Sequence, residues 1–154
     1  MVFTFSTLYH GFQQSKVKQV LKVLDHISIY YLIAGTYTPF LLIYQQNSFG
    51  YTLLWLLWSL TLLGTIFIIF FCGRWEILST IIYLLMGWIM LAGGDTFFTS
   101  MPHAVATLVI VGAGLYTIGV VFYIWDVHTY SHAVWHFLVL AAAICHYVAV
   151  LMSV

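Results

Sequence analysis

The chain has 154 residues, of which 64% are apolar and only 5% are charged. Soluble domains carry roughly 25% charged residues, so this composition excludes an ordinary water-soluble fold and indicates a membrane protein. The four basic and four acidic side chains cancel, and no nucleic-acid partner is expected, because such a partner requires a basic surface. We therefore expect residues 1–154 to form one integral-membrane domain.

Five stretches of the sequence are long and apolar enough to be membrane-spanning helices. Such a helix needs about 20 mostly apolar residues. The stretches are separated by short connections, including residues 95–102, and they cover residues 25–45, 51–72, 75–94, 103–125 and 132–153. Residues 1–12 are apolar but too few to span, so we interpret them as the last turns of a helix. The predicted fold is an all-α, polytopic transmembrane helix bundle with five full helices and an N-terminal helix stub.

The basic residues predict an orientation in the membrane. Lys16, Lys18 and Lys22 precede the first predicted span, and Arg74 follows the second. Because two crossings separate these positions, all four residues are expected on the same side. The positive-inside rule makes that side cytoplasmic. We therefore expect a multi-pass protein of the plasma (inner) membrane with its basic loops in the cytoplasm and its C-terminus outside.

Several histidines are predicted to lie at the same membrane depth as the basic residues. His10 ends the helix stub on that side, and His132 and His136 open the last span. Residues four apart share a helix face, so His132 and His136 can bind one metal ion together. His10 is the natural third ligand. Three protein ligands and an open position are typical of a catalytic zinc site.

Two further polar residues belong to the same predicted layer. Asp25 opens the first predicted span on the basic side, where a carboxylate can orient a metal ligand or a water molecule. Ser6 lies four residues before His10 and so shares its helix face. Zinc with an open position lowers the pKa of a coordinated water towards about 7, which is the basis of zinc hydrolase chemistry.

Each of these residues also has an ordinary structural interpretation. His132 is then an interfacial histidine that follows a helix-capping Ser131. Asp25 is then a favourable anion near a helix N-terminus. The adjacent His26 is expected to point about 100° away from Asp25 around the helix and to be interfacial.

Other residues are expected to serve helix packing. His146 lies ten residues beyond His136, which is about 15 Å along a helix, so it cannot join the same metal site. We expect it to form a hydrogen bond between helices. Gly112, Gly114 and Gly119 are expected to allow a neighbouring helix to approach closely.

Four blocks of sequence, in order along the chain, carry a resemblance to a known family. They are Ser6 to His10, Leu24 to His26 with Ala34 to Phe40, Tyr83 to Trp88, and Gly119 to Tyr123 with Ser131 to His136. At these residues the chain resembles the hemolysin III family, the bacterial branch of the progestin and adipoQ receptor superfamily. The likeness extends over essentially the whole chain.

This resemblance implies seven transmembrane helices and a zinc ion bound by three histidines near the cytoplasmic side. Carried over, the ligands are His10, His132 and His136. Asp25 corresponds to the aspartate that holds a zinc-bound water, and Ser6 to the serine beside the first ligand. The chain departs from the family in having five helices and a stub, so we expect the first helix and most of the second to be absent.

Three functions are compatible with these observations. The first is a zinc-dependent hydrolase of a lipid amide or ester, of the ceramidase type, with membrane lipid as substrate and the zinc as cofactor. Alkaline ceramidases in the wider superfamily support it by analogy. The second is a membrane-lytic, pore-forming hemolysin, although the helices show no polar stripe. The third is a receptor or lipid sensor with structural zinc.

Overall fold

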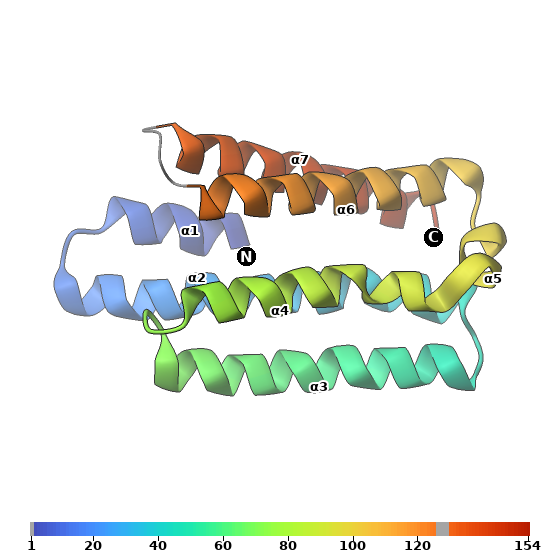
Figure 1. The fold of residues 1–154 in the computed structure, drawn as a ribbon, viewed down its shortest axis with the longest axis horizontal. Helices are drawn as coiled ribbons and strands as arrows, with labels where there is room; N and C mark the ends of the chain where they lie inside the picture. Colours follow the sequence, from blue (N-terminus) through green and yellow to red (C-terminus); the bar gives the residue numbers. More distant parts are fainter. Residues whose placement is uncertain (1, 126–129) are drawn as a thin grey trace.

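The computed structural model describes residues 2–125 and 130–154, without the side chain of His132. The described residues form helices that pack side by side and no strands (Figure 1). The helices are α1 (Val2–Gly11), α2 (Ser15–Tyr44), α3 (Ser48–Phe71), α4 (Glu76–Trp88), the 3₁₀ helix η1 (Ile89–Gly93), α5 (Gly94–Ser100), α6 (His103–Ile124) and α7 (Ser131–Leu151).

Five of these segments are long and apolar enough to cross a membrane, which confirms the predicted polytopic helical bundle. They are α2, α3, the combined segment Glu76–Ser100, α6 and α7 from Ala133 onward. α1 also confirms the predicted helix stub, because it covers only part of the depth of the bundle (Figure 1).

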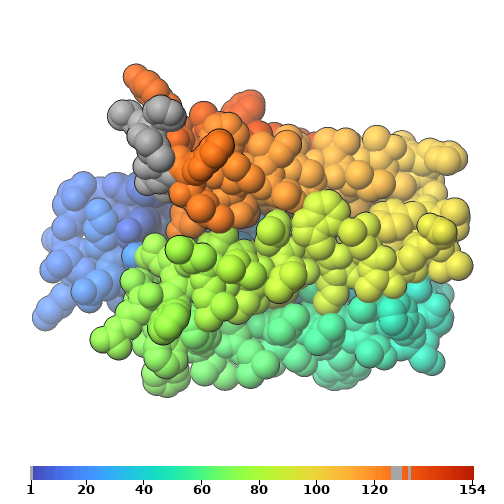
Figure 2. Space-filling model, in the orientation of Figure 1, coloured from blue at the N-terminus to red at the C-terminus, as the bar shows by residue number. Residues whose placement is uncertain are grey.

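The turns that join α1 to α2 and α3 to α4 lie at the same end of the bundle (Figure 1). Lys16, Lys18 and Lys22 occupy the first turns of α2, and Arg74 lies between α3 and α4. All four basic residues therefore share one end of the bundle, as predicted, and we call it the basic end. α1 lies at this end beside the start of α2 (Figures 1 and 2).

α2 begins earlier than predicted, at Ser15 instead of residue 25. Lysine is a good helix former, and a helix can continue beyond the apolar layer, where its lysines reach water. Asp25 therefore lies well inside α2. The interpretation of Asp25 as an anion at a helix N-terminus is wrong, because the helix-dipole effect falls off within the first turn.

The predicted connection at residues 95–102 is also largely helical. α4 ends at Trp88 and the chain continues through η1 into α5. Gly94 has a φ of 66°, in the left-handed region that glycine adopts at little cost. Phe97 is fully buried, and a methyl group on Gly93 would overlap its side chain. The predicted connection is wrong for residues 95–100, because a buried aromatic holds this segment against the bundle.

α6 and α7 pack closely where Gly112 faces His146. A methyl group at Gly112 would overlap the imidazole ring, whereas one at Gly114 would meet nothing within 4 Å. At Gly119 the nearest neighbour would be Trp135, at an ordinary 3.5 Å. Close approach is thus confirmed at Gly112 and is absent at Gly114 in the described part of the chain.

We expect Gly112→Ala to destabilise the protein by about 1–3 kcal/mol through overpacking. Gly114→Ala is the matched control, because it adds the same methyl group to the same helix in open space. The control should be neutral or slightly stabilising, since alanine favours helix over glycine by about 1 kcal/mol. Thermal unfolding of both variants in detergent measures the difference, and equal stabilities would contradict the observed packing.

Candidate metal centre

His10 and His136 meet at the basic end of the bundle, although 125 residues separate them in the sequence. His10 lies in the last turn of α1 and His136 in the second turn of α7. Their ring centroids are 5.7 Å apart and their planes are inclined at 87°. The structure therefore brings together two of the three predicted ligands from different helices.

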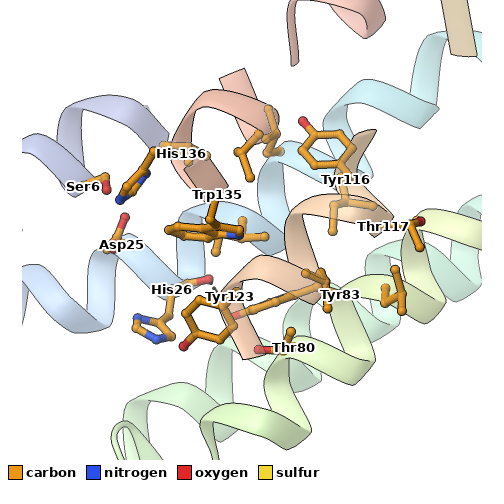
Figure 3. Close-up of a pocket in the computed structure, with 18 of the residues that line it drawn as sticks. Ser6, Asp25, His26, Thr80, Tyr83, Tyr116, Thr117, Tyr123, Trp135 and His136 are labelled. Atoms are coloured by element: carbon orange, nitrogen blue, oxygen red, sulfur yellow. Dashed lines mark hydrogen bonds between the residues drawn. The ribbon is translucent and has the colours of Figure 1, made fainter. Parts of the chain in front are cut away.

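Ser6 and Asp25 lie beside this histidine pair (Figure 3). Ser6 in α1, Asp25 in α2 and His136 in α7 point towards a common region (Figure 3). Ser6 is 7% exposed, Asp25 and His136 are half-buried, and His10 is exposed. The polar groups thus form a site that is open on one side and enclosed by helices on the other.

The spacing of the two imidazole rings fits a shared zinc ion. Zinc–nitrogen distances are about 2.0–2.1 Å, which places ring centres about 3.2 Å from the ion and about 5.3 Å from each other in a tetrahedral site. The observed 5.7 Å is close to this separation. Imidazole nitrogens with a carboxylate nearby are also the donor set that zinc prefers.

The third predicted ligand, His132, lies outside the described side chains, although its backbone belongs to α7 one turn before His136. Among the side chains that the structure does describe, no group of three or more His, Cys, Asp or Glu is close enough to hold a metal ion. The three-histidine set therefore stays a prediction. Ser131 is the first residue of α7 and not its cap, which is Tyr130.

A cavity of about 490 Å³ leads from this site into the bundle. Its walls include Ser6, Asp25 and His136 at the basic end and extend to Tyr116 and His146 deeper in the bundle (Figure 3). This volume is within the usual range of about 300–1,000 Å³ for small-molecule sites. The rest of the wall is mostly aliphatic and aromatic, which suits an apolar ligand.

An ion pair between two residues outside the predicted site lies at the mouth of the cavity. Lys22 Nζ in α2 lies 2.5 Å from Glu76 Oε1 in α4, and both residues line the cavity. The signal was present in the sequence, because opposite charges sit in two helices at the same end. Partly exposed pairs of this kind contribute roughly 0–1 kcal/mol to the stability of the fold. We therefore interpret the Lys22–Glu76 pair as a contact that positions α2 against α4.

His26 lies at the basic end but outside the histidine site. Its Nδ1 donates to the Lys22 carbonyl oxygen at 2.8 Å in the matching tautomer, and the Tyr83 hydroxyl donates to the His26 carbonyl oxygen at 3.0 Å. Its ring points away from Asp25 (Figure 3), as predicted. His26 also lines the cavity, which the sequence did not indicate.

His146 forms the predicted hydrogen bond between helices. Its Nε2 lies 3.1 Å from the carbonyl oxygen of Val109 in α6, and the residue is buried. Its position ten residues beyond His136 places it about 15 Å along α7 from His136. The two cysteines, Cys72 and Cys145, are free thiols.

The fold and the polar layer at one end define a polytopic integral-membrane protein. The family described as "Haemolysin-III related" matches residues 1–147. The chain belongs to this family, which confirms the resemblance inferred from the sequence blocks.

Three curated relatives illustrate the similarity. The chain is 42% identical to "Hemolysin-3 homolog" of Bacillus subtilis, over 98% of this chain and 71% of the relative. It is 38% identical to "Hemolysin-3" of Bacillus cereus, over 100% of this chain and 70% of the relative. It is 28% identical to human "Monocyte to macrophage differentiation factor", over 97% of this chain and 64% of the relative. This similarity supports membership of the wider superfamily. No solved structure matches the chain.

Proposed function

We propose that this protein binds a zinc ion at the basic end through His10, His132 and His136 and hydrolyses an amide or ester bond of a membrane lipid. The observation that supports this most strongly is the 5.7 Å approach of the His10 and His136 rings from different helices. Beside this pair, Asp25 and Ser6 face the mouth of a deep, mostly apolar cavity.

The proposed chemistry assigns a separate role to each polar residue. Zinc, when bound, supplies a Lewis acid that makes a water molecule more acidic. Asp25 takes a proton from the attacking water and returns it to the leaving nitrogen or oxygen as the carbonyl bond to that atom breaks. The hydroxyl of Ser6, beside Asp25, holds the carboxylate or the substrate carbonyl by a hydrogen bond.

The cavity supports a lipid substrate over a water-soluble one. A molecule whose polar group sits between Asp25 and His136 has its chain in the space that runs towards Tyr116. Apolar side chains of α2, α4, α6 and α7 line that space. A long acyl chain is therefore the natural occupant, because an apolar wall offers it surroundings like those it has in the bilayer, whereas a water-soluble substrate would lose hydrogen bonds to water there.

Hydrolysis is tested with the purified full chain, a fluorescent long-chain ceramide and the corresponding ester. We expect release of the fatty acid, loss of the activity on chelation and its return on adding zinc. Release of an entrapped dye from liposomes by both the wild type and His136→Ala would favour a pore instead. Zinc binding together with lipid binding but no cleavage would favour a receptor or sensor.

We also propose that the basic end faces the cytoplasm of a cell whose plasma membrane holds the protein, following the positive-inside rule. A phosphatase that is active only outside the cytoplasm, fused after Val154, should then be active. The same phosphatase inserted next to Arg74 should be inactive. The reverse pattern would contradict this orientation.

A further inference from the structure

His146 of α7 and Tyr116 of α6 are polar side chains in the deep part of the cavity. Their ring centroids are 5.6 Å apart, and both residues line the cavity. His146 is only 4% exposed. These residues take no part in the proposed metal centre, since His146 is ten residues beyond His136, or about 15 Å along the helix.

The hydrogen bond of His146 determines which ring atom remains available. Nε2 lies 3.1 Å from the carbonyl oxygen of Val109, which can only accept, so Nε2 carries the hydrogen. In a neutral imidazole the other nitrogen, Nδ1, is then an acceptor. The Cδ2–Nε2 edge of the ring faces Gly112, so the edge with Nδ1 is directed away from that glycine.

Nδ1 of His146 and the hydroxyl of Tyr116 each make no hydrogen bond to a described residue. Neither atom is among the fully buried polar side-chain atoms that lack a partner in the described part of the chain. Neither atom is therefore fully buried, and both residues line the cavity. Tyr37, at a similar depth, differs because its hydroxyl donates to the Gly87 carbonyl oxygen at 2.6 Å.

We propose that His146 and Tyr116 form a binding subsite for a hydroxyl group carried on the chain of a bound lipid. The lipid hydroxyl donates to Nδ1 of His146 and accepts from the hydroxyl of Tyr116. An acceptor and a donor side by side match a hydroxyl, which offers both functions. Leaving such polar groups without partners in an apolar cavity costs about 1–3 kcal/mol, and the ligand hydroxyl removes this penalty.

The depth of the subsite indicates where on the chain the hydroxyl lies. A zigzag hydrocarbon chain with carbon–carbon bonds of about 1.5 Å advances roughly 1.25 Å per carbon. The distance of about 15 Å from His136 to His146 along α7 therefore corresponds to a hydroxyl near the twelfth carbon. This assignment rests on the proposed function only in placing the polar head of the lipid at the basic end.

The subsite is tested by the binding of 12-hydroxyoctadecanoic acid and octadecanoic acid to the full chain in detergent, each displacing a fluorescent fatty acid. The wild type should prefer the hydroxylated acid by about fivefold, which corresponds to one net hydrogen bond. Tyr116→Phe, which removes only the hydroxyl, should bring the two affinities together and leave octadecanoic acid binding unchanged. His146→Leu should have the same effect on the preference.

Tyr147→Phe is the matched control, because Tyr147 adjoins His146 in the sequence and is 65% exposed on the outside of the bundle. This variant should keep the full preference. Equal binding of both acids by the wild type would overturn the subsite and leave only water in that part of the cavity. A preference that survives in both Tyr116→Phe and His146→Leu would overturn it as well.

The two acids contain no amide or ester bond, so this experiment does not depend on hydrolysis. A hydroxyl preference without any ceramide cleavage would support the subsite and count against the hydrolase. Ceramide cleavage without a hydroxyl preference would support the hydrolase and overturn the subsite.

Discussion

Replacing His136 by alanine should reduce the zinc content of the purified protein from about one ion per chain to nearly none. His136 and His10 come from different helices and approach within 5.7 Å, so loss of either ring leaves an incomplete ligand set. Residues that only support metal ligands typically change the affinity by about 10–100-fold, and loss of a ligand should exceed that range. Elemental analysis after dialysis against a defined low zinc concentration measures the effect.

The matched control for this prediction is His103→Ala. His103 begins α6 at the opposite end of the bundle, so its loss should leave the zinc content unchanged. His10→Ala should behave like His136→Ala, which would show that α1 contributes to the site. An unchanged zinc content in a folded His136→Ala protein, with the same helix content as the wild type, would contradict the proposed ligand set.

Replacing Asp25 by asparagine should lower the rate of lipid amide hydrolysis by about 10²–10⁴-fold, the usual contribution of a general acid–base group. Asparagine keeps the shape of the side chain but cannot accept a proton from water at neutral pH. Because Asp25 is not proposed as a ligand, most of the zinc should remain bound. Turnover of a fluorescent ceramide by the zinc-loaded variant, compared with its zinc content, separates the two roles.

Asp95→Asn provides the control for Asp25→Asn. Asp95 lies in the first turn of α5, at the other end of the bundle from Asp25 (Figure 1). This variant should hydrolyse the lipid at the wild-type rate. Full activity of Asp25→Asn would remove Asp25 from the mechanism, whereas loss of zinc in parallel with activity would make it a ligand.

The sequence predicted the depth of the site well because depth follows from counting crossings. Short connections alternate between the two ends of a bundle, so His10 and His136 could be placed at one end without any knowledge of packing. The rise of a helix, about 1.5 Å per residue, likewise predicted that His146 lies about 15 Å from His136. Both expectations are confirmed by the ring contact at the basic end and by the bond from His146 to Val109.

The sequence did not predict which helix faces meet. The cavity exists because residues from several helices converge, and no spacing within one helix reveals that Tyr116 and His146 share a wall with Asp25. The apolar composition also does not define where the helices end. It predicts a span that starts at residue 25, whereas the lysine-containing segment from Ser15 continues α2 beyond the apolar layer.

The most direct test of this account is the zinc content of the wild-type protein, purified as the full chain and equilibrated with zinc before dialysis. We predict about one zinc ion per chain, retained at a free concentration at which His136→Ala has lost it. A folded wild-type protein that retains no zinc under these conditions would contradict the metal centre and, with it, the proposed hydrolysis.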